Sequence, residues 1–270
     1  MRLLLLAAAI ASALPVAAAA QIAPHRAVYD LQLVRTNEGA ALSSVDGRLA
    51  IEIQGSSCEG WTASFRMVNR LRPMEGEIKT LDVQSTSFES GDALGLRFQQ
   101  KEFVNGSLQS ETRIRVNRDT ADGTGRGEQG SEGTAPFTVP AGAIFPMQHQ
   151  LKLMAIAANG GSRDSSVIYD GSDGEKAFRA IAFIGNRKAG GENIRDRSNQ
   201  QAAPLAALAS SPVSISFYPV SEAASDTPDY QVSFDLYENG VATGLVLDYG
   251  EFVLGGSLAS LEMLGQTGCD

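Results

Sequence analysis

Residues 140–160 read PAGAIFPMQHQLKLMAIAANG, and this stretch has the strongest helical pattern in a sequence that otherwise alternates as β-strands do. Phe145 and Pro146 mark the predicted start of the helix, because proline in the first turn loses no hydrogen bond and has its φ angle preset. Asn159 and Gly160 mark its end. The C-terminal half is apolar on every side, which predicts that a surrounding sheet encloses this one central helix.

Two interpretations of this helix remain open: it fills the core of the sheet, or it lines a ligand cavity. Leu151 and Met154 share one apolar face, so we expect a charged residue at either position to unfold the protein. Gln148 and Lys152 form a polar sector, where we expect alanine to cost little stability. The candidate cavity or binding residues are Phe145, Met147, Gln148, His149, Lys152 and Met154.

The first 20 residues have the pattern of a secretory signal peptide. Arg2 precedes an apolar run, and small residues lead to an expected cleavage after Ala20. We therefore expect a soluble mature chain, residues 21–270, folded as a single domain. No later stretch approaches the ~18 consecutive apolar residues that a transmembrane helix needs.

Composition restricts the classes of partner. The chain has 22 basic and 31 acidic side chains, a formal net charge of −9, and its basic residues are scattered. This balance argues against nucleic acids and anionic lipid headgroups as electrostatic partners.

The sequence has two cysteines, Cys58 and Cys269. In an exported protein an even number of cysteines favours a disulfide. This bond would close a loop of over 200 residues, for which chain entropy gives a stabilisation of about 5 kcal/mol.

Alternating apolar residues before the helix predict strands with one dry and one wet face. Asn105-Gly106 and Asn239-Gly240 predict tight hairpins in which both turn residues have positive φ angles, so the sheet is expected to be mainly antiparallel. We interpret residues 119–133 and 186–201 as loops. Strands are expected after the helix near residues 166–169, 176–184, 213–218, 230–237 and 241–254, with 176–184 covered on both faces.

No motif indicates catalysis, a metal or a cofactor. Gly125, Gly127 and Gly130 match G-x-G-x-x-G but do not open a helix. Asp170-Gly171 and Asp173-Gly174 lack the spacing of a calcium loop and are interpreted as turns. The sequence has no G-x-S-x-G. His25 and His149 are too isolated to form a zinc site, and both are expected to have structural roles.

Several motifs together resemble the EipB family of periplasmic proteins. They are Pro24-His25-Arg26-Ala27 with Tyr29 and Leu31, Phe145-Pro146-Met147 with His149, Tyr169-Asp170-Gly171 with Asp173-Gly174, and Asp248-Tyr249-Gly250 with Phe252, besides Cys58 and Cys269. The resemblance implies an antiparallel sheet coiled into a β-spiral, like an open barrel, around one helix. It also implies a disulfide between the two cysteine positions, a likeness to lipoprotein carriers and a link to envelope integrity. It assigns no catalytic residues.

These observations lead to a hypothesis: a non-enzymatic periplasmic protein that supports envelope integrity. It would bind an apolar, lipid-like ligand, or a periplasmic or outer-membrane protein. Two alternatives stay open, a hydrolase of envelope polymers that uses paired carboxylates, and a purely scaffolding partner of another periplasmic protein. An apolar cavity would favour the first hypothesis, and facing carboxylates would favour the hydrolase.

Overall fold

The computed structural model describes residues 21–37, 41–130, 135–191, 200–220 and 226–265. The predicted signal peptide and Cys269 lie outside these ranges. Within them the chain forms one antiparallel sheet of fourteen strands, one α-helix and one short 3₁₀ helix. The mainly β, antiparallel prediction is therefore confirmed.

The strands follow one another in space almost as they do in sequence. From one edge the order is β8-β7-β6-β5-β4-β3-β2-β1-β14-β13-β12-β11-β10-β9. The elements are β1 (His25–Thr36), β2 (Leu42–Ser56), β3 (Gly60–Pro73), β4 (Lys79–Glu89), β5 (Gly95–Val104), β6 (Ser107–Asn117), β7 (Gly125–Gln129), β8 (Ala135–Val139), α1 (Pro146–Ala158), β9 (Arg163–Ile168), β10 (Phe178–Ile184), η1 (Gln200–Leu205), β11 (Ser210–Pro219), β12 (Tyr230–Tyr237), β13 (Ala242–Asp248) and β14 (Phe252–Met263).

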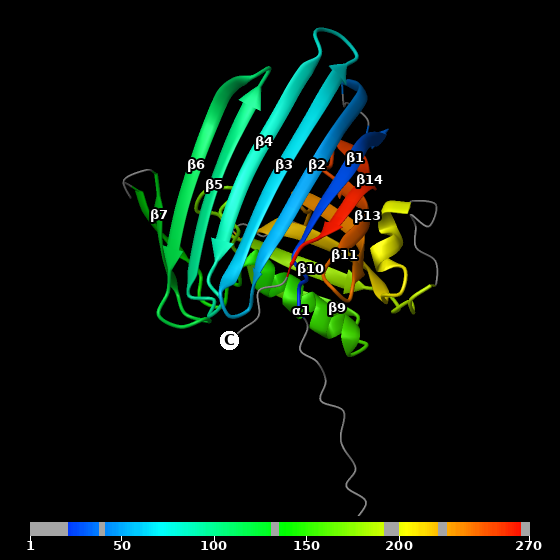
Figure 1. The fold of residues 1–270 in the computed structure, drawn as a ribbon. Helices are drawn as coiled ribbons and strands as arrows, with labels where there is room; N and C mark the ends of the chain where they lie inside the picture. Colours follow the sequence, from blue (N-terminus) through cyan, green and yellow to red (C-terminus); the bar gives the residue numbers. More distant parts are fainter. Residues whose placement is uncertain (1–20, 38–40, 131–134, 192–199, 221–225, 266–270) are drawn as a thin grey trace, which may run out of the picture.

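The sheet curves but does not close. Its edge strands β8 and β9 do not pair with each other. Ile144, after β8, instead forms one parallel bridge to Ile168 of β9, and its N–H donates to the Val167 carbonyl at 2.9 Å. In Figure 1 the long strands β2–β6 run in front of β10 and β11, and α1 lies along the lower end beside β9. The helix thus joins the two edges and covers one end of the sheet.

Helix α1 has one buried face. Met147, Leu153 and Met154 are buried in a core with Ile53, Trp61 and residues of β9–β12. Leu151 is half-buried, whereas Lys152 and Ala158 are exposed. The prediction that the sheet encloses the helix on all sides is wrong for these residues. The apolar side chains of the exposed half are mostly alanines, which leave little apolar area in water.

The predicted helix limits are confirmed, since Phe145 is the N-cap, Asn159 is the C-cap and Gly160 has φ +73°. The Asn105-Gly106 turn also has the expected positive φ angles, 52° and 81°. At Asn239-Gly240 only the glycine has a positive φ. That hairpin is a longer loop, in which the Asn239 side chain accepts the Val241 N–H at 3.2 Å.

Two predictions about strands are corrected. Residues 119–133 contain the strand β7, whose glycines concealed it: a Cβ on Gly127 would lie 2.2 Å from the Phe137 ring. Glycine therefore lets the aromatic ring of β8 lie flat on β7. Strand β10 is not covered on both faces, because Arg179 and Phe183 are exposed.

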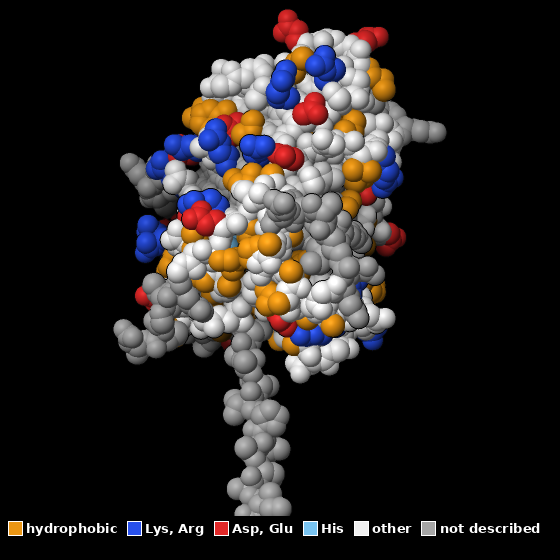
Figure 2. All heavy atoms as spheres, turned by 45° about the vertical axis from the view of Figure 1, so that its right-hand side comes forward, with side chains coloured by type: hydrophobic (Ala, Val, Ile, Leu, Met, Phe, Trp, Pro, Cys, Tyr) orange, Lys and Arg blue, Asp and Glu red, His pale blue; other side chains and the backbone are white. Residues whose placement is uncertain are grey.

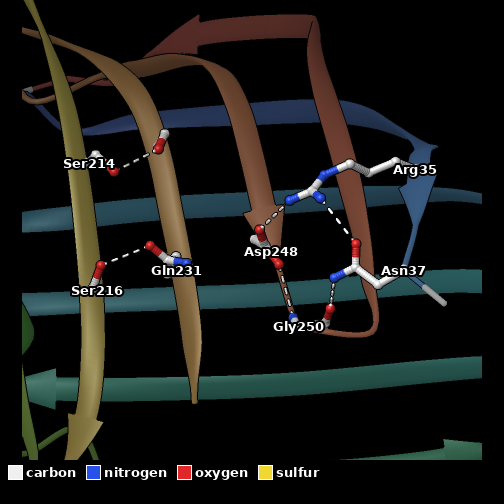
Figure 3. A network of polar contacts seen from close by, with 8 residues as sticks. Arg35, Asn37, Ser214, Ser216, Gln231, Asp248 and Gly250 are labelled. Atoms are coloured by element: carbon white, nitrogen blue, oxygen red, sulfur yellow. Dashed lines mark hydrogen bonds and ion pairs between the residues drawn. The ribbon is translucent and has the colours of Figure 1, made fainter. Parts of the chain in front are cut away.

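The outer face of the sheet is polar. Figure 3 shows two contacts between β11 and β12, Ser233 donating to Ser214 at 3.0 Å and Ser216 donating to Gln231 at 2.9 Å. Arg35 bonds Asp248 at 3.0 Å in the same view. Figure 2 shows a face on which acidic and basic side chains lie close together above a cluster of hydrophobic ones. The alternation predicted from the sequence therefore places polar groups outward.

Candidate functional site

The first turn of α1 is held by two side chains. The Phe145 N–H donates to Gln148 Oε1 at 3.0 Å, which closes the turn on itself. The carboxylate of Glu89, at the end of β4, accepts the Met147 N–H at 3.0 and 3.1 Å. A carboxylate suits this place, because the first N–H groups of a helix have no partner within the helix and carry partial positive charge.

Glu89 is a buried acid, with only 1% of its surface exposed. Burial raises the pKa of its carboxyl to about 7, while the backbone N–H groups of α1 and the charge of Arg118 act in the opposite direction. Near neutral pH this group therefore exists in both its charged and neutral forms. The Glu89 carboxyl, which gains or loses this proton, lies where β4 meets α1.

Arg118 completes this junction from the end of β6. Its guanidinium donates to the carbonyls of Ala93 at 2.7 Å and Ala143 at 2.5 Å, and to Gln148 Oε1 at 3.0 Å. It also lies 4.2 Å from the centroid of the Phe145 ring. Phe145 and Gln148, two predicted binding residues, are thus part of a packed and hydrogen-bonded joint.

A second polar group lies farther along α1, where it faces β9. Lys152 Nζ lies 2.7 Å from Asp164 Oδ1 and donates to Ser166 Oγ at 2.8 Å. The Ser166 hydroxyl donates to Asp164 Oδ2 at 2.6 Å. His149 Nε2 lies 3.3 Å from the same oxygen, without hydrogen-bond geometry.

The charges of this group follow from its burial. Burial acts to raise the pKa of Asp164, but the hydrogen bonds from Lys152 and Ser166 and the Lys152 charge keep it below its usual value. Burial lowers the pKa of His149, and the Asp164 charge only partly offsets this. The group therefore consists of a carboxylate, an ammonium and a neutral imidazole at neutral pH.

This arrangement does not activate a nucleophile. The Ser166 oxygen accepts from an ammonium, and its proton is directed to a carboxylate that already has a cation. The carboxylates of Glu89 and Asp164 are thus both bonded to groups that hold the structure together. Among the described residues, no cluster of three or more histidine, cysteine or acidic side chains could hold a metal ion.

The other predicted site residues lie in the core or outside the described ranges. Met147 and Met154 are buried, with 8% and 4% of their surfaces exposed. Cys58 is not a free thiol, but Cys269 lies outside the described residues, so their pairing stays a prediction. His25 opens β1 as expected, and its Nδ1 lies 2.7 Å from the Ala23 carbonyl oxygen.

Sequence reasoning did not find Glu89, Arg118 or Asp164. For Glu89 a signal existed: in β4 it continues the inward alternation of Val83, Ser85 and Ser87, so a carboxylate was directed into the core. Arg118 likewise continues the inward alternation of Ile114 and Val116, and Asp164 shares the buried face of β9 with Ser166 and Ile168, so the same signal existed for both.

An apolar surface lies between the two halves of the sheet. Strands β2 and β3 pack their inner side chains against those of β12 and β13, yet many of these side chains stay only half-buried. We name this the inner apolar surface. Its half-buried residues are Ile51, Ala63, Phe65, Met67, Leu71, Phe217, Val232, Phe234 and Leu247.

Known proteins share this sequence and fold. Residues 16–265 match the family model described as EipB-like. A curated relative from Brucella abortus (strain 2308), named "Cell envelope integrity protein EipB", is 30% identical over 97% of this chain and 93% of its own length. A crystal structure from Brucella abortus, titled a β-barrel-like protein of domain of unknown function DUF1849, matches with a TM-score of 0.82. Its identity is 28%, over 91% of this chain and all of that one.

The described residues include no helix that is long and apolar enough to cross a membrane. The family match spans most of the sequence, and the TM-score of 0.82 over 91% of the chain shows that the matched structure has the same fold. The chain therefore belongs to the EipB-like family.

Proposed function

We propose that this protein supports cell-envelope integrity in the periplasm, without catalysis, by holding an apolar or amphipathic ligand against its inner apolar surface. The envelope role rests on the family and on the name of the Brucella relative. The ligand class rests on the half-buried aromatic and aliphatic side chains between β2–β3 and β12–β13. Sites for apolar ligands are lined mostly by hydrophobic and aromatic side chains of this kind.

The open sheet favours this role. Its edge strands β8 and β9 do not pair with each other, so the two halves of the sheet are not joined by a strand ladder along that edge. The same geometry favours a spiral of the kind found in lipoprotein carriers. The absence of catalysis is also part of this proposal, and it is supported by the structural bonds of Glu89, Asp164 and Ser166.

A fluorescent fatty-acid analogue, dansyl-undecanoic acid, tests the ligand class. We expect saturable binding to the mature protein, and loss of that binding in Met67→Glu, because an acyl chain packed on the inner apolar surface would remove water from the new carboxylate, which costs free energy. The matched control is Val34→Glu, which adds the same charge at a position that is 64% exposed. Met67→Ala serves as a second variant if the glutamate variant does not fold.

Equal binding by Met67→Glu, Met67→Ala and Val34→Glu would contradict the site, and no binding by the unaltered protein would contradict the ligand class. Mass spectrometry of an organic extract of the purified native protein identifies the natural ligand. We expect an acyl-chain compound in that extract at a stoichiometric amount.

A further inference from the structure

Exposed arginines gather on the outer face of β5 and β6. Arg97 of β5 lies directly opposite Arg115 of β6 in the strand register, and Arg113 lies next to them on the same face. Within the described residues, neither Arg97 nor Arg115 forms an ion pair. Like charges directly opposite each other destabilise a sheet. A chain of net charge −9 thus carries a local group of three arginines, of which Arg97 has no acid opposite it on either neighbouring strand.

Beside these arginines lies a surface hollow of about 260 Å³. Its lining includes Arg97 and Arg113 but no carboxylate, and the remaining residues are Thr86, Ser87, Phe88, Phe98 and Gln99. Phe88 is 38% exposed and pairs with Arg97 across the β4–β5 ladder. The hollow therefore combines two guanidinium groups, one exposed aromatic ring and neutral hydrogen-bonding groups.

Two further hollows continue it on either side. One of about 460 Å³ shares Thr86 and Gln99 with the first and adds the cations Arg26, Arg66 and Lys101. The other, of about 290 Å³, shares Phe88 and Arg97. We name the three together the outer groove; it crosses β1–β6 on the face of β2–β6 that Figure 1 turns toward the reader.

Four acids in or beside the outer groove have ion-pair or hydrogen-bond partners. Glu52 bonds Arg26 at 2.6 Å, and Asp82, beside the groove, bonds Arg66 at 2.8 Å. Glu111 bonds Arg113 at 2.6 Å, which fixes that guanidinium at the rim. Asp92 accepts from Ser90 at 2.6 Å and from the Leu94 N–H at 3.0 Å. Glu128 lies opposite Arg115 in the strand register.

We propose that the outer groove binds an acidic polypeptide segment of a partner protein, laid across the strands. Guanidinium forks bind carboxylates in bidentate fashion. The amides and hydroxyls of Gln84, Gln99 and Thr86 match an extended backbone, and Phe88 supplies contact for an apolar side chain. The net negative charge of the whole molecule disfavours an anionic membrane surface as the partner. A narrow groove also fits a single polypeptide chain better than a flat bilayer.

A dye-labelled peptide of alternating glutamate and glycine tests the proposal by fluorescence anisotropy with the mature protein. We expect binding that weakens as salt rises, and none to the same peptide with glutamine in place of glutamate. Arg97→Gln with Arg115→Gln should weaken binding about tenfold or more, since each charge-assisted bond contributes more than a neutral one. The control pair Arg163→Gln with Arg179→Gln removes the same charge from exposed positions on β9 and β10.

Three results would overturn the proposal. The first is that the acidic peptide does not bind. The second is that both pairs of variants weaken peptide binding equally, which would mean that binding depends on the net charge of the protein and not on the outer groove. The third is binding of phosphatidylglycerol vesicles, lost in the Arg97 and Arg115 variant, with no binding of the peptide. Because the fatty-acid probe reports on the inner apolar surface, its result does not depend on the outer groove.

Discussion

The carboxylate of Glu89 accepts the backbone N–H of Met147 at 3.0 and 3.1 Å, which joins the end of β4 to the first turn of α1. One buried acid thus links the long strands of one half of the sheet to the helix that covers its end. Because burial raises the pKa of this acid to about 7, the stability of the joint depends on pH in a range that can be tested.

The native protein should lose stability as pH rises from about 4.5 to 7, and Glu89→Gln should abolish this loss. The folded protein keeps the Glu89 proton in this range while the unfolded chain releases it, so the free energy of unfolding of the native protein falls as pH rises. A pKa raised from 4.5 to about 7 corresponds to about 3 kcal/mol. Urea unfolding at pH 4.5 and pH 7.5 measures the difference between native protein and variant.

Glu128→Gln is the matched control, because Glu128 is exposed. We expect the difference in the free energy of unfolding between this control and the native protein to stay nearly constant from pH 4.5 to pH 7.5. If the free energy of unfolding of Glu89→Gln changes with pH as that of the native protein does, the Glu89 carboxyl is not the cause of the pH dependence.

Lys152→Ala should lower stability, contrary to the expectation from the sequence. Lys152 provides the cation next to the Asp164 carboxylate, which is only 5% exposed, so its removal leaves a buried charge with fewer partners. The cost should be about 1–3 kcal/mol, toward the lower end because the Lys152 side chain is 46% exposed. Circular dichroism melts give the value.

Met154→Asp should be more destabilising than Lys152→Ala, because Met154 is only 4% exposed and lies in an apolar core cluster. An unpaired charge there costs several kcal/mol. Equal melting temperatures for the two variants would mean that α1 does not pack as described.

We expect Cys58 and Cys269 to form a disulfide in the mature protein. Thiol titration of the denatured, unreduced protein should find no free thiol. Cys58→Ser should then lower the melting temperature, because it removes a disulfide whose loop closure stabilises the folded state by up to about 5 kcal/mol. Two titratable thiols would show that the bond does not form.

Arg97→Gln should stabilise the protein in the absence of a ligand. The substitution removes the like charge that lies opposite Arg115 across β5 and β6, while the other neighbour of Arg97 is the neutral Phe88, so the gain is up to about 1 kcal/mol. The gain should shrink as salt screens the charges. Thermal melts at low and high salt measure it, with Arg163→Gln as the control; a lower melting temperature at low salt would contradict this account.

The sequence predicted those features that depend on local patterns. The limits of α1 followed from Pro146 and Gly160, and the range 230–237 was correct at both ends for β12. Local patterns failed where a distant side chain set the choice, as for Gly127, which is a strand residue because Phe137 lies on it. For Glu89 and Arg118 the alternation indicated an inward direction but not the bonding partners, which lie far along the chain.

The strand order has a consequence for folding. Every strand pair except β1–β14 joins neighbours in sequence, so the two meanders, β1–β8 and β9–β14, can each form from short hairpins. Their union must wait for the last strand, because His25 and Met263 are paired across more than 200 residues. Until then each half exposes strand edges that can capture other chains. Once it has formed, the Leu264 N–H bonds the Pro24 carbonyl at 2.9 Å. A circular permutant that joins these ends and opens between Asn105 and Gly106 should therefore build the same sheet in a new order.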